Sequence, residues 1–440
     1  MSLAAKLPYS HPYANGFGYG GTNVPTDTDG LDYLSRMATA DGTGLETGVA
    51  GAIDRFIKAC KADNIWDSIR SSCILAGARS LNGALVPIKN EGPELVDINS
   101  LPTPSLTEAG GSSGAWDAST RKMLSNAVGT NTSHPRFLFP FAGMAAGKQY
   151  AISGRVSGDT SHVEFIRAGA TGDLAAINKV TGEFSASLAS SGTNGFMFLL
   201  NGTLAPTSVT IESLSIREVI DDPINSPVGN GFAGGDYSRT DGLTGDGTSY
   251  LDTGRANNAD PQNDHHMAAY STSTQVGGNI SFAGAVDGTY AKTIYRTSAN
   301  SWLLYDGRLT APTSGVANAS LVGLVGVTRT GSSAFSGRVA GVPAEKNEPS
   351  FSWGPLNIFV FGYNGSGTLT APTSSRLAFY SIGTSLGTDP ADGLADLDTA
   401  VTNLMADITF FFNTGLNPAD YDTETVRYVN AGYAAGGTLE

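Results

Sequence analysis

The sequence predicts a mainly β protein with two β-sandwich domains, a small helical region near the N-terminus and a helix near the C-terminus. Three observations predict this class. Short runs with period-two alternation recur from about residue 105 to 412, and Gly, Asn or Asp separates nearly every one. Glycine supplies 56 of the 440 residues, and charged residues supply only 15%. Such a composition is typical of extracellular β-proteins, whose many tight turns need residues that tolerate positive φ.

Charge and hydropathy restrict the classes of partner. The formal net charge is −14 and the isoelectric point lies near 4.7, so we expect repulsion of phosphate backbones and no nucleic-acid partner. No run of 18 apolar residues occurs, and we expect no membrane insertion. The N-terminal segment lacks the apolar core of a signal peptide. We therefore expect a protein made in a cytoplasm but composed for work outside a cell.

Residues 1–30 are dense in Gly, Pro, Asn and Tyr and show little alternation, so we expect an extended N-terminal arm. Disordered tails are usually poor in aromatic residues. This segment contains Tyr9, Tyr13, Phe17 and Tyr19, which favours an arm that becomes ordered against a neighbouring subunit. Residues 413–440 have a similar composition and are expected to form a C-terminal tail.

Residues 31–104 are expected to form a helical lead and a linker. In a first helix, Leu31, Leu34 and Met37 recur at three-residue spacing. One face of a second helix carries Val49, Ile53, Phe56, Ile57 and Cys60, continued by Ile65, Trp66 and Ile69. The opposite face carries Asp54, Arg55, Lys58 and Lys61. These helices could pack against each other or against a β-domain, and the sequence does not decide between the two.

The two cysteines, Cys60 and Cys73, fall in this helical region. Because helix geometry rarely brings such a pair within bridging distance, we expect two buried free thiols. Residues 76–104 follow as the linker. Prolines at 87, 93, 102 and 104 limit regular structure there, and one strand is expected around 84–88.

Residues 105–222 form the first predicted sandwich. Its strand-like runs are PRFLFPFAG, QYAISGRVSG, SHVEFIRAG, GEFSASLAS, NGFMFLLNG and SVTIESLSIREV. In the last run, Ile211, Leu214, Ile216 and Val219 mark a terminal strand with a bulge or kink.

Residues 223–412 form the second predicted sandwich. Its runs are GDGTSYLDTG, HHMAAYSTS, GNISFAGAV, AKTIYRTS, SWLLYDG, LVGLVGVTRTG, AFSGRVAGV, NIFVFGYNG and SRLAFYSIG. A helix is expected to close this domain. Its helically spaced apolar residues are Leu394, Leu397, Val401, Leu404, Met405 and Ile408.

A family resemblance accompanies these patterns. The runs 235–272 and 375–405 resemble laminin-G or concanavalin-A-like jelly-roll domains in tailed-bacteriophage virion proteins, and the helical stretch before them resembles the lead that accompanies such domains. The segment 136–219 resembles carbohydrate-binding-type sandwiches in the same kind of protein, placed as an insertion between lead and jelly roll. The resemblance implies a fibre, tail or head-decoration component of a phage particle. It implies no catalytic residues.

Two sequence features invite a metal site. His265 and His266 follow Asp260 and Asp264, but adjacent side chains on a strand point to opposite faces, so we expect a surface strand with one inward imidazole instead. The run GDGTSYLD contains Asp246 and Asp252, but it lacks the alternating carboxylates and bidentate Glu of an EF-hand loop. Related sandwich folds sometimes hold calcium in loops, so this alternative stays open.

Motifs for catalysis are lacking in the sequence. No single pair of acids stands out for glycan hydrolysis, no GxSxG motif occurs, and GFGYGG at 16–21 has neither the strand nor the helix of a phosphate loop. We therefore predict that the protein is not an enzyme. We assign no catalytic, cofactor-binding or metal residues and expect no cofactor.

Aromatic residues of the second sandwich suggest glycan binding as an alternative. Trp302, Tyr305, Trp353 and Tyr363 lie in or beside predicted strands. On a strand such residues usually belong to the core, but on an exposed face or loop they could stack on a sugar ring.

The predicted function is that of a virion structural protein, which assembles through its terminal regions with other virion proteins and with copies of itself, as a homotrimer, and displays its sandwiches outward. The alternatives are an adhesin that binds host-surface glycans and a polysaccharide depolymerase.

Overall fold

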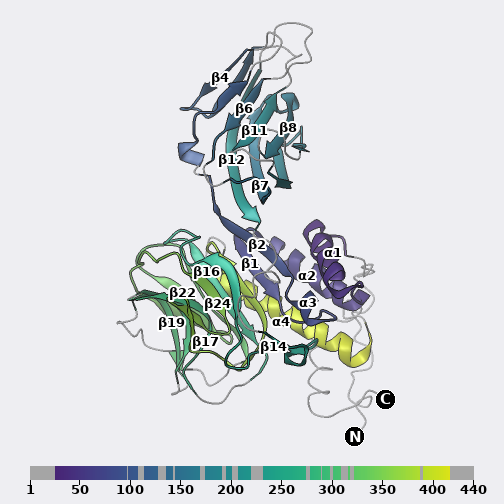
Figure 1. Cartoon of the computed structure of the whole chain (residues 1–440), viewed down its shortest axis with the longest axis vertical. Coiled ribbons are helices and arrows are strands. Elements are labelled where there is room, and N and C mark those ends of the chain that lie inside the picture. The colour runs from purple at the N-terminus through teal and green to yellow at the C-terminus, as the bar shows by residue number, and fades with distance from the viewer. Residues whose placement is uncertain are drawn as a thin grey trace, which may run out of the picture. The chain divides into compact units, whose positions relative to one another are not determined.

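The computed structural model describes residues 25–96, 98–107, 113–126, 135–141, 144–168, 174–190, 195–200, 207–219, 231–273, 278–288, 290–297, 301–308, 316–317, 322–386 and 390–416. The chain forms two compact units (Figure 1). One contains residues 91–221, and the other combines residues up to 90 with those from 222 onward. The chain is mainly β, as predicted. Of the predicted arm (1–30) and tail (413–440), residues 1–24 and 417–440 lie outside the described residues, whereas residues 28–30 and 413–414 belong to helices.

The unit of residues 91–221 is a sandwich of two antiparallel sheets. The strands of one sheet are β10 (Glu183–Ala189), β7 (Gln149–Gly158), β12 (Thr207–Val219), β5 (Lys122–Asn126) and β4 (Ser113–Asp117). The other contains β3 (Ser105–Thr107), β6 (Arg136–Phe139), β11 (Phe196–Leu200), β8 (Val163–Ala168) and β9 (Leu174–Ala175). Short 3₁₀ turns span Ile98–Ser100 and Thr160–His162. All six predicted strands are present, while β3, β4, β5 and β9 were not predicted.

Apolar side chains from both sheets fill this first sandwich. They include Phe137, Phe139, Phe184, Phe196 and Phe198, which pack through edge and stacked ring contacts. The bulge expected in β12 is confirmed, because its register with β7 shifts between Ile211 and Ser213.

The second unit has a layer of helices and two layers of sheet. The sheet next to the helices follows the order β2 (Pro87–Glu94, through residues 87–90), β1 (Ile69–Ile74), β27 (Arg376–Gly383), β16 (His265–Ser271), β21 (Gly323–Arg329), β22 (Phe335–Val339) and β23 (Val342–Lys346). β14 (Gly242–Thr244) also pairs with β27, and β13 (Tyr237–Ser238) pairs with β14 after a 3₁₀ turn at Gly234–Asp236.

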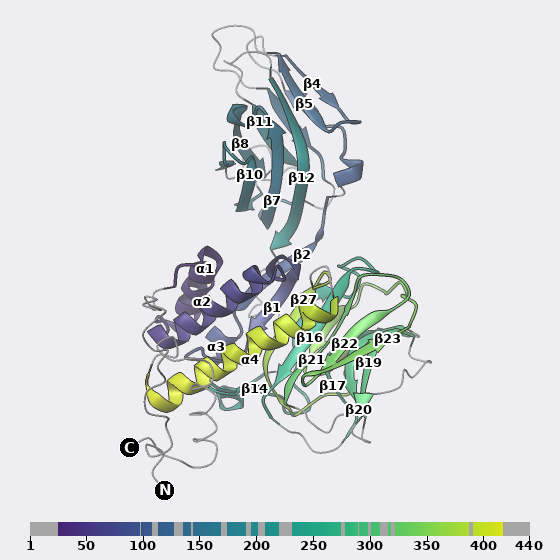
Figure 2. The same cartoon turned by 180° about the vertical axis from the view of Figure 1, so that it is seen from behind.

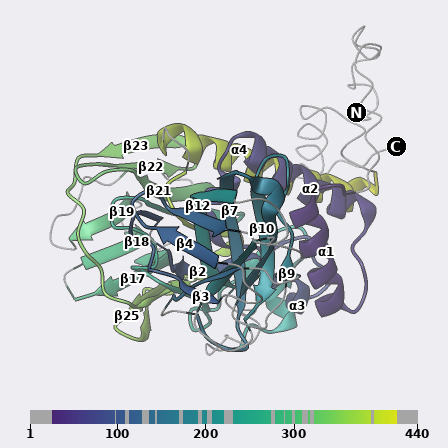
Figure 3. The same cartoon turned by 90° about the horizontal axis from the view of Figure 1, so that it is seen from above.

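The outer sheet of this unit has the order β15 (Leu251–Ala256), β24 (Asn357–Val360), β17 (Ile280–Asp287), β18 (Tyr290–Arg296), β19 (Ser301–Arg308) and β20 (Val316–Ala317). β25 (Tyr363–Gly365) pairs with β17, and β26 (Thr368–Thr370) pairs with β25. From above, α4 lies beside β22, and β17 to β19 lie farther from that helix (Figure 3). Every predicted strand of this region is present, although NIFVFGYNG is divided between β24 and β25.

The sheet next to the helices lies between them and the outer sheet, and we call it the middle sheet. Its alternating residues enter two different cores. Ala268 and Tyr270 of β16 face the helices, whereas Met267 and Ala269 of the same strand face the outer sheet. The helices are α1 (Thr28–Asp41), α2 (Thr47–Ala62), the short α3 (Leu81–Ala84) and α4 (Pro390–Thr414). α2 and α4 run side by side (Figure 2). The helical lead therefore packs both against another helix and against the β-domain.

The C-terminal helix is confirmed as α4. All six of its predicted apolar residues are buried in the core shared with α1, α2 and the middle sheet. None of the helices within the described residues has the length and apolar character needed to cross a membrane.

The predicted continuation of the second helix beyond Cys60 is wrong. α2 ends at Ala62, Asn64 has a φ of +58°, and a 3₁₀ turn at Trp66–Ser68 leads directly into strand β1. Asn is one of the few residues that adopt positive φ at low cost, so it ends the helix. Cys73 consequently lies on β1, not on a helix. Both cysteines are buried free thiols, as predicted.

The buried face of the first helix also differs from the prediction. Tyr33 and Met37 are fully buried, but Leu31 is 47% exposed. The predicted linker contains the helix α3 and the strand β2, so it is more regular than expected. Pro87 is tolerated in β2 because it is the first residue of the strand.

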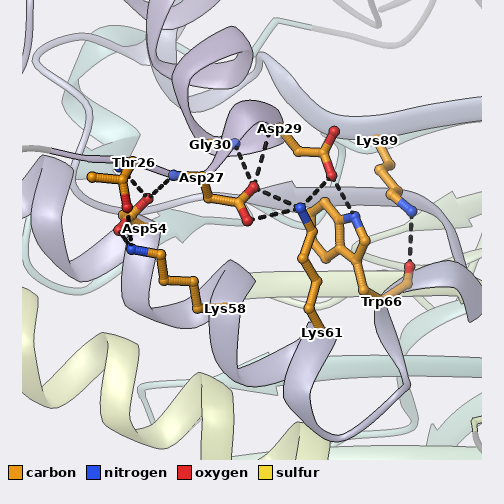
Figure 4. A network of polar contacts seen from close by, with 9 residues as sticks. All are labelled: Thr26, Asp27, Asp29, Gly30, Asp54, Lys58, Lys61, Trp66 and Lys89. Atoms are coloured by element: carbon orange, nitrogen blue, oxygen red, sulfur yellow. Dashed lines mark hydrogen bonds and ion pairs between the residues drawn. The ribbon is translucent and has the colours of Figure 1, made fainter. Parts of the chain in front are cut away.

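Asp54 was expected on the solvent-facing side of the second helix and is instead only 5% exposed. Its Oδ1 accepts hydrogen bonds from the backbone N–H groups of Thr26 (3.1 Å) and Asp27 (2.9 Å), and its Oδ2 lies 2.6 Å from Nζ of Lys58 (Figure 4). These contacts fix the chain immediately before α1 onto α2.

A second group of contacts in Figure 4 continues from this point. Asp27 caps α1 by accepting from the backbone N–H groups of Asp29 and Gly30. Lys61 lies 2.7 Å from the carboxylates of both Asp27 and Asp29, and Asp29 accepts from the indole N–H of Trp66 at 2.9 Å. The segment where the predicted arm meets the folded unit is therefore fixed by charged hydrogen bonds.

Candidate functional site

The four aromatic residues predicted for sugar stacking lie in two different environments. Trp302 is fully buried between the sheets of the second sandwich, with its ring 4.9 Å from Phe282. Trp353 is 5% exposed and packs edge-on against His265 at 4.7 Å. Neither indole presents a face to a large ligand. Both are core residues, as aromatic residues on strands usually are, and not sugar-stacking residues.

Tyr305 and Tyr363 lie together on the other face of the outer sheet. They belong to an apolar cluster with Val286, Ala291 and two residues that the sequence analysis missed, Tyr295 and Leu303. We call Tyr295, Tyr305 and Tyr363 the tyrosine cluster. Tyr305 is 9% exposed, and Tyr295 and Tyr363 are half-buried.

Strand alternation explains how the cluster forms. In β19, Trp302 and Leu304 face the core, so the alternate residues Leu303 and Tyr305 face outward. In the register of β18 with β19, Tyr295 lies opposite Leu303 and diagonally from Tyr305. Diagonal aromatic pairs are within reach of each other, and the two rings are 6.3 Å apart at 64°.

A tight reversal between β24 and β25 places Tyr363. β24 runs antiparallel to β17, and two residues later β25 runs parallel to the same strand. The reversal occurs at Phe361, whose φ of +73° is rare for a bulky residue. Burial of the Phe361 ring against Phe232, at 5.0 Å, holds this conformation. The strained turn thus returns Tyr363 to the outer face beside Tyr305.

The cluster is a set of neutral hydrogen-bonding phenols. Burial is the main cause that raises the pKa of each of the three tyrosines. Proximity to Tyr363 and Tyr305 further raises the pKa of Tyr295, and Glu348 further raises that of Tyr305. At physiological pH each hydroxyl can therefore both donate and accept, and each ring offers an apolar face.

The histidine pair does not form a metal site. As predicted, the two imidazoles point to opposite faces of β16: Nε2 of His265 lies 2.8 Å from Asp306, and Nε2 of His266 lies 2.7 Å from Oγ of Ser381. The expectation of a surface strand is wrong, because both imidazoles are fully buried between layers. Among the described residues, no group of three or more His, Cys, Asp or Glu side chains is placed to hold a metal ion.

Asp246 and Asp252 each serve a turn. Asp246 accepts from the backbone N–H groups of Thr248 and Ser249, at 2.7 and 2.6 Å, and these bonds lower its pKa to about 2. Asp252 accepts from the backbone N–H of Gly254 at 2.9 Å. The two carboxylates are used as turn caps and are not brought into one ligand set within the described residues.

Comparisons with known proteins add little to this geometry. No protein-family model and no curated protein sequence matches the chain. The tandem CBM22 domains of Paenibacillus barcinonensis Xyn10C are similar in structure with a TM-score of 0.22 and 11% identity, over 67% of this chain and 98% of theirs. Trypanosoma rangeli sialidase in complex with sialic acid gives 0.30 and 9%, over 69% of this chain and 54% of its own. The chain thus spans about half of the sialidase. Scores this low carry no argument about ligand or activity.

Proposed function

We propose that this protein binds glycans through the tyrosine cluster of its second sandwich. One observation carries the proposal: three tyrosines from three strands meet on the outer face of a sheet whose Trp302 is used in the core. Sheet faces that only need to be soluble do not require a shared aromatic surface of this kind. The strained turn at Phe361, which returns Tyr363 to this surface, is a further cost that a purely structural sheet need not carry.

The chemistry of the cluster suits a sugar ring. The C–H face of a pyranose packs on aromatic faces, and its hydroxyl groups need partners that both donate and accept. Tyr295 and Tyr363 supply partly exposed rings and phenol groups. Glu348 lies close enough to Tyr305 to raise the pKa of that tyrosine. Each ring contact contributes on the order of 1 kcal/mol, so several contacts are needed for measurable binding.

A glycan array on the full chain tests the proposal. Tyr363→Ala and Tyr295→Ala should lower the signal of any positive glycan by roughly fivefold each. Tyr290→Ala is the matched control, because Tyr290 is a half-buried tyrosine on the same strand as Tyr295 that stacks instead on Phe351 at 5.4 Å. Equal binding by all variants would place the binding surface elsewhere.

We further propose that binding occurs without turnover. Glycosidases generally use two carboxyl groups about 5 to 10 Å apart. Among the described residues, Glu348 alone is a carboxylate that raises the pKa of a tyrosine of the cluster, Tyr305. Incubation of the full chain with any bound polysaccharide, followed by a reducing-end assay, should give no new ends. Turnover that Glu348→Gln abolishes would instead support a depolymerase.

A second proposed function is that of a structural component of a tailed-phage virion, as the sequence resemblance implies. The fixed segment at Thr26 and Asp27 supports it, since an arm that binds a neighbouring subunit transmits that attachment best from a rigid point. Deletion of residues 1–24 spares the cap of α1. We expect such a chain to fold with unchanged spectra but to lose its homotrimer in light scattering and to be left out of particles. Normal assembly of the shortened chain would remove the arm from the proposal.

A further inference from the structure

A cluster of buried charges lies inside the second sandwich. It is independent of the tyrosine cluster proposed to bind glycans. Two cross-strand pairs face each other there: His265 with Arg329 on the middle sheet, and Lys292 with Asp306 on the outer sheet. All four side chains are fully buried. Asp306 accepts from Nε2 of His265 at 2.8 Å and from Nε of Arg329 at 2.7 Å, so it joins the two sheets.

Each carboxylate of this cluster already has a guanidinium partner. Arg329 pairs with Asp306 and also donates to the backbone carbonyl of Asp306 at 3.0 Å. Arg255 pairs with Asp260 through two contacts of 3.0 and 2.5 Å, and both side chains are buried. Two ion pairs are therefore internally neutral.

Lys292 is the charge left over. Its Nζ makes no hydrogen bond to any described residue, although the side chain is fully buried. The ammonium lies 5.4 Å from the centre of the Trp353 ring, and the indole Nε1 of Trp353 is a second buried donor without an acceptor in the described chain. Two unused donors thus belong to neighbouring side chains.

The electrostatic balance identifies what would satisfy them. Burial lowers the pKa of Lys292 to about 8, with Asp260 and Asp306 opposing the shift and Arg255 and Arg329 adding to it. At neutral pH the group is thus mainly a cation, and with two guanidinium groups against two carboxylates it leaves one positive charge unbalanced. His265 cannot supply the missing negative charge, because an imidazole is either neutral or positive, and burial lowers its pKa. The half-buried Glu348 lies near Arg329 and Asp306, and burial raises its pKa.

We propose that Lys292 and Trp353 bind a small monovalent anion of halide size inside the second sandwich. An anion accepts hydrogen bonds from both the ammonium and the indole N–H and supplies the missing negative charge. A water molecule would accept the same bonds but leave the buried positive charge unbalanced. Because Lys292 is fully buried and Trp353 nearly so, we expect the site to exclude larger anions.

Bromide is the probe for this site. In the full chain at constant ionic strength, the melting temperature should rise saturably as bromide replaces gluconate, and Lys292→Met should abolish the rise. Lys89→Met is the matched control: Lys89 also lies over an indole, 4.4 Å from the Trp66 ring, but its Nζ donates to the Trp66 carbonyl at 2.8 Å. This control should keep the full bromide response.

Trp353→Phe keeps the ring and removes only the N–H donor, so it serves if Lys292→Met fails to fold. It should weaken bromide binding at least about tenfold, and binding to the unmodified protein should also weaken above pH 8 as Lys292 loses its proton. A crystal grown in bromide should show an anomalous peak bonded to Lys292 and Trp353. The same bromide response in Trp353→Phe as in the unmodified chain, or a map without that peak, would overturn the proposal.

Discussion

The two sandwiches share an architecture but fill their interiors in opposite ways. The first packs phenylalanine rings from both sheets into one continuous apolar core, in which Phe198 touches Phe139, Phe184 and Phe196. The second contains an apolar core and, in addition, a cluster of buried ions that includes Asp306 and Lys292. Rings alone suffice to hold two sheets together, so the ions of the second sandwich are not required by its fold class.

The outer faces differ in the same direction. In the first sandwich, the core between the sheets contains large aromatic residues such as Phe137, Phe139, Tyr150, Phe184, Phe196 and Phe198. In the second, Tyr295, Tyr305 and Tyr363 form a separate cluster on the outer face. The buried ions and the aromatic outer face are both costly for stability, and both occur in the second sandwich. The second sandwich is therefore the one to examine for binding.

The largest expected effect is the loss of a core ring in the first sandwich. Phe198→Ala should destabilise residues 91–221 by about 4 kcal/mol, because a fully buried phenyl ring is removed from a packed core. Hydrogen-exchange mass spectrometry should show faster exchange in peptides from 136–219 and no change in those from 265–383. Phe165→Ala, at a position 37% exposed, is the control and should cost less than about 1 kcal/mol. Equal loss in both units would mean that they unfold as one.

The next effect concerns the ions of the second sandwich. Asp306→Asn leaves Arg329 buried without its charged partner and should cost about 3 kcal/mol in the free energy of unfolding. Asp32→Asn breaks a surface ion pair, in which the side chain of Asp32 is 69% exposed and that of Arg36 is 41% exposed. This change should cost less than about 1 kcal/mol. Urea denaturation of both variants measures the contrast. A similar small cost for both would show that the buried cluster contributes no more than a surface pair.

A pH-dependent effect, small over any single pH unit, should come from His266. Burial lowers its pKa from 6.5 to about 3, with the Thr384 carbonyl and Asp260 opposing the shift and Lys292 and His265 adding to it. The unfolded chain takes up a proton near pH 6.5 and the folded chain only near pH 3, so stability falls as pH drops through this range, by about 1.4 kcal/mol per pH unit. His266→Gln should show a shallower acid slope in urea denaturation than the unmodified chain. His162→Gln in the first sandwich is the control, and matching slopes in all three would contradict the assignment.

Sequence patterns gave the strands of both sandwiches because alternation and turn residues are local signals. They could not tell which face of a strand is inside when both faces are apolar. In SWLLYDG, Trp302 and Leu304 alternate with Leu303 and Tyr305, and only the partner strands decide that the tryptophan is buried. Tyr295 was missed for the same reason, since its place beside Tyr305 depends on the register of β18 with β19.

Other features depended on contacts between distant segments. Asp54 lies on the polar side of α2 by period, yet it is buried by the residues that precede α1. The charge cluster joins residues from 255 to 353, and no local motif marks Lys292 as unpaired. The end of α2 could have been found, because Asp63 and Asn64 are residues that favour helix ends and positive φ.

The central claim, glycan binding at the tyrosine cluster, is tested most directly by NMR of the full chain with ring-labelled tyrosine. On titration with a glycan found positive on the array, the resonances of Tyr295, Tyr305 and Tyr363 should shift together and saturably. Those of the fully buried Tyr33, Tyr150 and Tyr380 should not move. Saturable binding that leaves the three cluster resonances unchanged would contradict the account.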